Sequence, residues 1–277
     1  MSADAPLQAA QTDDLACSPR FYCAALPLEA GRHVKLPSSV AHHALKVLRL
    51  PTGSAIRLFN GQGGEYLAEL EHTGKRTAKA HIHSWNPQDR ASPLHTRLVQ
   101  AVSSSYKMDW CIQKAAELGV HAIQPVFCQR TQHRLNATRA AAKTAHWQAV
   151  ATATAEQCGC NRPTAVAPPV SLDYFLAQPA PTGVRLLLHP GAAADLTNTA
   201  LALRNANGNA RSKICIIDLL VGPEGALSKA EVVSAQKAGF NPCHLGPRIL
   251  RTETAGLVAL SILQSLVGDL DQGLVAS

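Results

Sequence analysis

"KICIIDLLVGPEGALSKAE" at residues 213–231 joins an apolar run, a turn rich in glycine and proline, and the start of a helix. The run at 213–222 is almost continuously apolar, which is typical of a strand buried on both faces of a parallel sheet. Ser228 suits the N-cap of the helix, and Glu231, three positions later, completes a capping box. Glu224 lies inside the turn instead of at the cap, so capping does not account for it. A strand followed by a turn and a helix is the building unit of an α/β domain.

The same alternation of strands and helices extends to both sides of this stretch. Apolar strands that alternate with helices indicate a parallel sheet covered on both faces. The sequence therefore predicts an α/β domain over residues 93–277. Its further strands are expected at 94–102, 121–128 and 184–190, and its helices at 109–119 and roughly 137–157.

The part of the chain before this domain follows a β-like pattern. Residues 54–70 alternate around Asn60-Gly61, which is a strong signal for a β-hairpin. A short helix is predicted at 38–50. We therefore expect a small β-barrel or a compact β-domain with one helix over residues 20–88, separated from the α/β domain by a turn- and proline-rich segment.

The composition narrows the classes of partner and compartment. Lys and Arg number 26 against 19 Asp and Glu, a net charge of +7 that fits an anionic partner. No apolar run reaches the roughly 18 residues that a membrane span needs. Residues 1–19, rich in Ala, Asp and Gln, predict a disordered tail without the features of a signal peptide. Eight scattered cysteines without such a signal favour a reducing, cytoplasmic location.

Cys158 and Cys160 are the only cysteines that lie close together in the sequence. They could form half of a zinc site, but no second pair of Cys or His follows at ligand spacing. We therefore expect ordinary thiols and no metal. A metal-dependent oxidoreductase built on these two cysteines is the alternative, which elemental analysis would test.

Three strand ends are candidates for a site, because ligands of open α/β sheets bind beyond the carboxyl ends of the strands. The strand at 184–189 leads into "HPGA", the strand at 214–221 into "VGPEGALSKAE", and the strand at 242–245 into "LGPRILRTETA". Gly and Pro in these loops allow sharp turns and leave main-chain groups free to bind a ligand. The dinucleotide-binding and phosphate-loop motifs do not occur at these strand ends, and the nucleophile elbow of serine hydrolases is absent.

Two of these loops carry a resemblance to a known family. "LVGPEGALSKAE" (220–231) together with "LGPRILRTETA" (245–255) resembles the ribosomal RNA uridine-N3 methyltransferases of the SPOUT superfamily. Further segments match in the family's order and spacing, so the resemblance covers nearly the whole chain after residue 19. These are "RFY" (20–22), "HALKVLR" (43–49), "KMDWCIQKAAELGV" (107–120), "AEQCGCNR" (155–162) and "LHP" (188–190).

The resemblance implies a fold, a cofactor and a substrate. The implied fold has an N-terminal PUA/OB-like RNA-binding β-barrel and a C-terminal α/β SPOUT domain with a parallel sheet. The chain of that domain would form a deep trefoil knot at about 184–270. S-adenosyl-L-methionine would bind in the knot, and members of the family are homodimers. The implied reaction is methylation of N3 of one uridine in the 16S ribosomal RNA of the small ribosomal subunit.

The resemblance also implies which residues bind the cofactor, and the basic residues suggest the RNA contacts. Backbone groups of the three loops would hold the cofactor, namely Leu188, His189, Pro190, Val221, Gly222, Pro223, Glu224, Gly225, Leu245, Gly246, Ile249, Leu250 and Thr252. RNA contacts are expected from Arg20, His43, Lys46, Arg49, Lys107 and Arg162, and the alternative for each is a solvated surface charge. Candidates for base stacking are Phe21, Tyr22 and Tyr106.

The proton on uridine N3 sets the catalytic requirement, because it must leave before N3 can attack a methyl group. A nearby cation favours the resulting anion. Arg251 is the first candidate for this cation and Arg130 the second. Glu253 or Glu224 would take the proton or hold an arginine in place, and the sequence leaves these roles open. The alternative is that Thr252 and Glu253 only cap the apolar helix that follows them.

Two positions depart from the family's pattern. Ala226 stands where the second of two glycines is usual, which argues against very close backbone approach at that position. Cys160 stands where an arginine is common, so either Arg162 takes over its contact or the contact is lost.

Two other functions stay open, a SPOUT enzyme that methylates another RNA or a ribose 2′-hydroxyl, and a non-catalytic RNA-binding protein. Titration with the cofactor separates the last of these from a catalyst.

Overall fold

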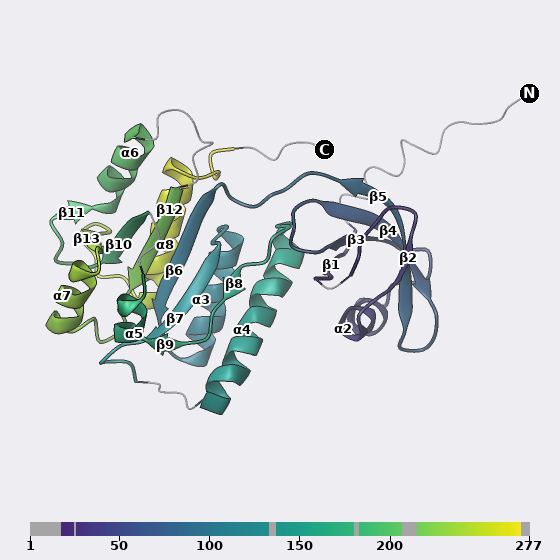
Figure 1. Ribbon diagram of the computed structural model, residues 1–277, viewed down its shortest axis with the longest axis horizontal. Coiled ribbons are helices and arrows are strands. Elements are labelled where there is room, and N and C mark those ends of the chain that lie inside the picture. The colour runs from purple at the N-terminus through teal and green to yellow at the C-terminus, as the bar shows by residue number, and fades with distance from the viewer. Residues whose placement is uncertain (1–17, 25, 133–136, 180–182, 207–214, 273–277) are drawn as a thin grey trace, which may run out of the picture. The chain divides into compact units, whose positions relative to one another are not determined.

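The structure, a computed structural model, describes residues 18–272 except 25, 133–136, 180–182 and 207–214 (Figure 1). Most of the tail expected at 1–19 therefore lies outside the described residues. The chain divides into two compact units, of which unit 1 runs to Ala91 and includes Ala155–Arg162. Unit 2 comprises Ser92–Thr154 and the chain from Pro163 onward. No helix among the described residues is long and apolar enough to cross a membrane.

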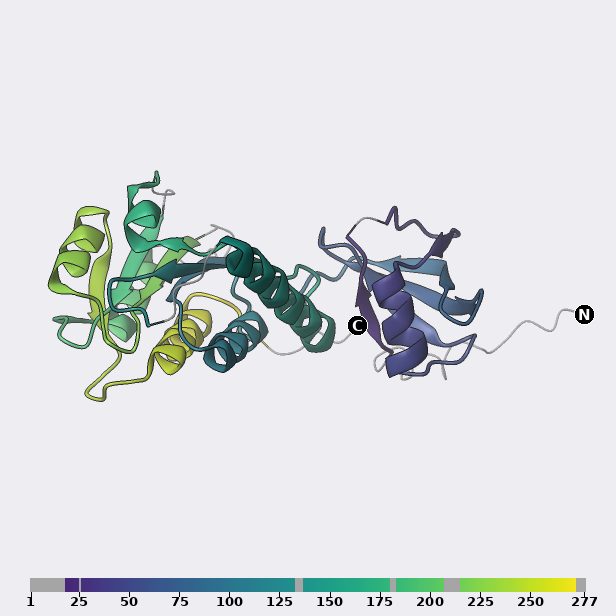
Figure 2. The same cartoon turned by 90° about the horizontal axis from the view of Figure 1, so that it is seen from below.

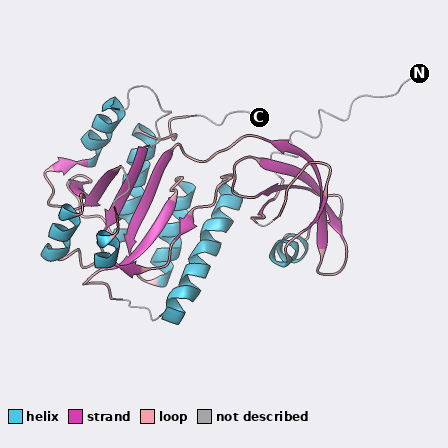
Figure 3. Ribbon diagram, viewed as in Figure 1, coloured by secondary structure: helices cyan, strands magenta, loops and turns pink. Residues whose placement is uncertain are grey.

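Unit 1 is built on a five-stranded sheet, coloured magenta at the N-terminal end of the chain in Figure 3. β1 and β3 are parallel and the other pairs are antiparallel. The predicted hairpin at Asn60-Gly61 is confirmed, because β3 and β4 pair on either side of it and Gly61 has a φ of 85°. The order of the strands is β1 (Arg20–Tyr22), β3 (Ala55–Phe59), β4 (Glu65–His72), β5 (Ala78–Asn86) and β2 (His33–Lys35).

The helix expected at 38–50 is shorter and less regular than its sequence indicates. An α-helix, α2 (Ser38–His42), continues directly as a π-helical turn, η1 (His43–Val47). Ala44 is completely buried, whereas the residues from Lys46 to Arg49 are exposed. The apolar residues of the turn are thus divided between the core of unit 1 and its surface.

Arg20 lies inside unit 1, which corrects the RNA contact expected of it. Its side chain is 4% exposed, its Nε donates to Glu65 Oε2 at 2.8 Å, and its Nη1 donates to the carbonyl of Ala155 at 2.6 Å. The guanidinium also lies 4.5 Å from the ring centre of Phe59. Burial lowers the pKa of Arg20 from its usual value, and the bond to Glu65 opposes that shift. A buried cation with its donors engaged holds unit 1 together and is not free to bind phosphate.

Unit 2 has the expected architecture, a parallel sheet with helices on both faces. All of its strand pairs are parallel. The order is β11 (Ala194–Asp195), β13 (Asn241–His244), β10 (Val184–Leu188), β12 (Cys215–Val221), β6 (Leu94–Ala101), β7 (Ala122–Phe127) and β8 (Ala165–Val166), and β9 (Val170–Ser171) also pairs with β7. The trefoil knot expected at about 184–270 stays a prediction.

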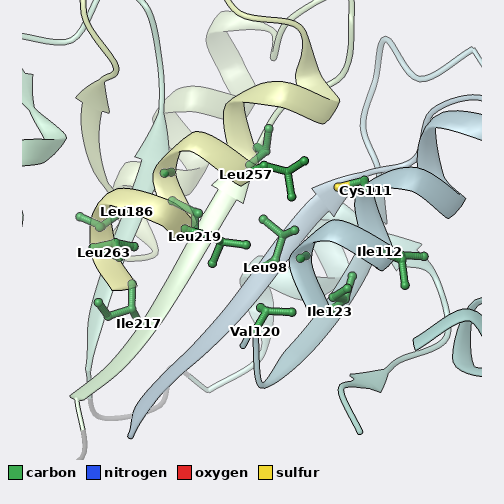
Figure 4. Close-up of a cluster of buried hydrophobic side chains, with 14 of the residues drawn as sticks. Leu98, Cys111, Ile112, Val120, Ile123, Leu186, Ile217, Leu219, Leu257 and Leu263 are labelled. Carbon is green, nitrogen blue, oxygen red and sulfur yellow. The ribbon is translucent and has the colours of Figure 1, made fainter. Parts of the chain in front are cut away.

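The helices of unit 2 are α3 (Ser105–Glu117), α4 (Ala137–Cys158), α5 (Leu172–Ala177), α6 (Leu196–Ala206), α7 (Lys229–Lys237) and α8 (Thr252–Leu266). The larger of two buried clusters packs side chains of β6, β10 and β12 against α3, α4, α6 and α8 (Figure 4). The smaller cluster packs the opposite face of these strands against α5 and α7. α3 and α8 lie side by side in Figure 2 and are in contact.

The local signals for α7 are confirmed. Ser228 accepts from the backbone N–H of Glu231, and the Glu231 side chain accepts from the N–H of Ser228, which is a complete capping box. Gly239, with a φ of 89°, follows the last turn of the helix. Lys114 and Glu117 of α3 also pair, as the spacing of three residues predicts.

A charged triad crosses the middle of the sheet in unit 2, and the sequence analysis did not anticipate it. Asp218 of β12 is 1% exposed and lies in register with Arg97 of β6 and with Arg185 of β10. Arg97 donates two hydrogen bonds to the carboxylate, at 2.8 and 2.7 Å, and Arg185 donates one at 3.1 Å. The triad thus joins three neighbouring strands. Two of them, β10 and β12, each lead into one of the candidate loops.

Candidate functional site

The carboxyl ends of three neighbouring strands enclose one cavity of about 410 Å³. Leu188 at the end of β10 is in register with Val221 of β12 on one side and with Cys243 of β13 on the other. Because parallel strands end at the same edge of a sheet, the loops that follow them converge there. All the residues predicted to hold the cofactor line this cavity except Gly225. The cavity has the volume of a site for a small organic ligand.

A buried chain of hydrogen bonds fixes the loop at Gly222. Gln100, near the end of β6, is 1% exposed and donates from Nε2 to the hydroxyl of Thr252 at 2.9 Å. The Thr252 hydroxyl in turn donates to the carbonyl of Gly222 at 2.5 Å. The amide group of Gln100 therefore sets the direction of the second bond, because the hydroxyl has only one hydrogen to give. The interpretation of Thr252 as a helix cap is wrong, since α8 has no side-chain cap hydrogen bond.

Ala226 has a φ of 57°, in the left-handed region that favours glycine. Its backbone N–H donates to the carbonyl of Pro223 at 2.9 Å, which closes a tight turn beside the cavity that Ala226 itself lines. The departure from glycine at this position therefore introduces a strained backbone conformation in addition to a methyl group.

Replacing Ala226 by glycine is expected to stabilise the protein by up to about 1 kcal/mol, because the cost of a left-handed alanine exceeds the extra chain entropy of glycine. Urea unfolding measures this difference. Ala230→Gly, in the exposed part of α7, is the matched control and is expected to destabilise by about 1 kcal/mol. Equal destabilisation by both changes would show that strain at residue 226 does not matter.

Lys107, expected to contact RNA from beside the cleft, lines the cavity itself. It extends from α3, lines the cavity, and donates from Nζ to Glu224 Oε1 at 3.0 Å. Its Nζ is also 3.6 Å from Glu253 Oε2. The hydrogen bond to Glu224 raises the pKa of Lys107, so the amine stays protonated at neutral pH. The two carboxylates thus hold a lysine, whereas the sequence left open whether they take a proton or hold an arginine.

The two carboxylates differ in their surroundings. The Glu224 side chain is 38% exposed, whereas that of Glu253 is 12% exposed. Glu253 Oε2 is buried and forms no hydrogen bond with the described residues. This oxygen has Lys107 Nζ as an ion-pair partner at 3.6 Å, so its capacity to accept a hydrogen bond is unused.

Arg251 is the N-cap residue of α8 and lines the cavity with its side chain exposed. Its guanidinium forms no hydrogen bond or ion pair within the part of the chain that the structure describes. The positive charge of Arg251 lowers the pKa of Lys107, against the larger effect of Glu224. Arg130, the second catalytic candidate, instead donates from Nη1 to the carbonyl of Gly225 at 2.9 Å. Arg130 and Gly225 therefore support the loop from outside the cavity.

Five of the expected RNA contacts lie in unit 1, and three of them are exposed, namely Lys46, Arg49 and Arg162. Arg162 is held by Asp89 at 2.7 Å and by the carbonyl of Gln62 at 2.9 Å. His43 is half-buried, with its ring 5.6 Å from that of Phe21.

The aromatic candidates for base stacking are only partly suited to that role. Phe21 is completely buried and cannot stack a base, whereas Tyr106 is 79% exposed. Sequence reasoning missed Trp85, which is 53% exposed on β5. Alternation from the buried Ala78, Ala80 and Ile82 places Trp85 on the exposed face, so this signal could have identified it.

Free thiols are found at Cys23, Cys111, Cys128, Cys158, Cys160 and Cys243, and no group of metal-ligating side chains occurs among the described residues. Cys158 is exposed, whereas Cys23, Cys111, Cys128 and Cys243 are buried. Burial raises the pKa of each of these four thiols to about 12.

At about pH 8 a maleimide is expected to label Cys158 rapidly, and the four buried cysteines only after unfolding, since the thiolate is the reactive form. Peptide mass spectrometry after a short pulse measures the label at each position. Labelling of Cys111 as fast as that of Cys158 would contradict the buried arrangement beside Gln100.

Comparison with known proteins gives a consistent result over both units. A family model described as an RNA methyltransferase domain matches residues 90–264, and one described as an RNA methyltransferase PUA domain matches residues 36–82. Ribosomal RNA small subunit methyltransferase E of Synechocystis is 30% identical over 84% of this chain and 73% of its own length.

Two solved structures are similar over most of the chain. The same enzyme of Neisseria gonorrhoeae, bound to S-adenosyl methionine, is 36% identical with a TM-score of 0.80, over 91% of this chain and 99% of that one. A Legionella pneumophila structure in complex with the bound cofactor SAM is 33% identical with a TM-score of 0.83, over the same shares.

Proposed function

The chain belongs to the RNA methyltransferase family that includes ribosomal RNA small subunit methyltransferase E, and from this premise we propose that it methylates N3 of a uridine in 16S ribosomal RNA. It is a methyltransferase for ribosomal RNA that uses S-adenosyl-L-methionine. The single observation that carries the proposal is the convergence of three strand ends on one cavity beside Arg251, Glu253 and Lys107.

The cavity fits S-adenosyl-L-methionine in size and in chemistry. Leu188, Gly222 and Leu245, one from each of the three loops, line it, and main-chain groups of these loops would bind the polar edges of an adenosine. Gly246, with a φ of 90°, has no atom within 4 Å of the position that a Cβ would occupy, so space is open there. When bound, the cofactor supplies a methyl group carried on a sulfonium sulfur.

The residues beside the cavity can move and hold the charges that the reaction requires. Glu253 accepts the proton of uridine N3, because its Oε2 is buried without a donor while Glu224 is engaged with Lys107. Arg251 stabilises the negative charge that then spreads over N3, O2 and O4 of the uracil, since its guanidinium is free of other described partners. Lys107 stays protonated, and its Nζ lies 3.6 Å from Oε2 of the Glu253 carboxylate.

The RNA and the assembly complete the proposal. Unit 1 binds the RNA through Lys46, Arg49 and Arg162, which are exposed cations that position a phosphate backbone without reading its sequence. We propose that the protein works as a homodimer in the cytoplasm, as the family resemblance implies, and that its substrate is the small ribosomal subunit.

The experiment that tests this function measures transfer of a labelled methyl group from S-adenosyl-L-methionine. Unmodified small subunits, naked 16S ribosomal RNA and large subunits serve as substrates in parallel. We expect label only in RNA of the small subunit. Cofactor binding without transfer to any substrate would indicate a non-catalytic RNA-binding protein, and label in the large subunit would indicate a different RNA target.

A further inference from the structure

We propose that the turn at Lys46, Val47, Leu48 and Arg49, called the 46–49 turn below, is a wedge for RNA. In this arrangement Val47 and Leu48 pack against an unstacked base, and the two cations bind the phosphates on either side of it. The inference rests on the proposed function, because it takes RNA as the substrate and adds the mode in which unit 1 binds it.

The first observation is the exposure of two adjacent aliphatic side chains. Val47 is 60% exposed and Leu48 is 42% exposed. Single exposed aliphatic residues are common on protein surfaces, but neighbouring ones at the tip of a turn form a small apolar patch that favours contact with a partner. The residues on either side of the pair are anchored in unit 1. Ala44 is completely buried, and Leu45 and Leu50 pack on the core.

The second observation is a strained backbone that presents these side chains rigidly. The turn follows the π-helical segment η1, and Arg49 has a φ of 53°, one of two described non-glycine residues with a positive φ. The N–H of Leu48 donates to the carbonyl of His43 at 2.9 Å, and the N–H of Leu50 donates to that of Ala44 at 3.0 Å. Strain of this kind persists where the surroundings fix it, and it concentrates at functional sites.

The third observation is the charge of the 46–49 turn. Lys46 and Arg49 flank the two aliphatic residues, both are exposed, and the four residues include no acid. An apolar pair between two cations is complementary to an unstacked base between two phosphates. Apolar side chains inserted at a base step and cations on the neighbouring phosphates are a known mode of binding nucleic acid. A purely apolar protein partner would leave both cations without a counter-charge.

The test compares binding of a fluorescent hairpin fragment of 16S ribosomal RNA at several salt concentrations. The double change V47S and L48S is expected to weaken binding about tenfold, since contact with one base is worth roughly that much. The dependence of affinity on salt stays unchanged, because no charge is removed. K46Q together with R49G, which suits the positive φ, is expected to lower the salt dependence by about one to two released ions.

Matched controls are L201S and V233S, which make the same substitutions at similarly exposed positions of unit 2. They are expected to leave RNA affinity unchanged, and all variants are expected to bind S-adenosyl-L-methionine like the parent protein. Unchanged RNA affinity in the V47S and L48S variant would overturn the wedge while leaving the proposed function intact. A change of its self-association in sedimentation would also overturn it and assign the turn to a second copy of the chain. Failure of the parent protein to bind or methylate the RNA would instead reject the proposed function.

Discussion

Replacing Arg251 by lysine is expected to lower the rate of methyl transfer by about 10²- to 10³-fold while cofactor affinity changes by less than about threefold. The guanidinium offers several donors in a fixed plane, which can hold two acceptor atoms of a uracil anion together. A lysine keeps the charge but loses that geometry, so the anion is stabilised less. The proposed cofactor contacts come mainly from the backbone of the three loops, which the change leaves in place.

The measurement separates the turnover number from the dissociation constant of S-adenosyl-L-methionine, by single-turnover kinetics and by calorimetry. Arg204→Lys, in the last turn of α6, is the control and is expected to change neither quantity. Equal losses of rate and of cofactor affinity would reject the assignment, because Arg251 would then bind the cofactor and not the base.

Replacing Asp218 by asparagine is expected to lower the free energy of unfolding by about 3–5 kcal/mol, the cost of breaking a buried ion pair. The change leaves Arg185, which is 5% exposed, and the partly buried Arg97 without a counter-charge. Arg185 also lies 4.9 Å from the ring centre of Phe240, so it cannot reach water without disturbing the core. The melting temperature is expected to fall by about 10 °C.

Urea unfolding and thermal unfolding check this prediction. Asp173→Asn, at an exposed position of α5, is the control and is expected to cost well under 1 kcal/mol. A triple variant, Arg97→Met, Asp218→Leu and Arg185→Met, is expected to recover most of the lost stability, because it removes the uncompensated charges together with the bond. A loss below about 1 kcal/mol in Asp218→Asn would show that the triad contributes little to the sheet.

Features set by neighbours in the sequence could be predicted. The strand, turn and capped helix at 213–231 follow from an apolar run, Gly and Pro, and the pair Ser228 and Glu231. Since parallel strands end at one edge, these local elements also place the three loops beside one another. The cavity could therefore be predicted from the positions of the strand ends. This requires only that the strands are parallel, and not which strand pairs with which.

Features set by distant pairs could not be predicted from such signals. Arg20 is buried because Glu65 and the carbonyl of Ala155 meet it, and these partners lie 45 and 135 positions away. Lys107 reaches the cavity because α3 lies beside α8, and its glutamate Glu224 lies 117 positions away.

One sequence signal for the charged triad was available. Asp218 stands inside an apolar strand, where a carboxylate needs a buried cation, and each of two other strands carries one arginine. Its partners could be identified only with the register of the strands, which the sequence does not give.

The position of the methyl group on the RNA tests the central claim most directly. Small subunits methylated by the protein are digested to nucleosides, and the product is compared with methylated uridine standards by chromatography and mass spectrometry. We predict N3-methyluridine at a single nucleotide of 16S ribosomal RNA, with at least about a hundredfold less formed per unit time in the initial phase of the Arg251→Lys reaction. A methyl group on a ribose hydroxyl, on carbon 5 or on cytosine would contradict it.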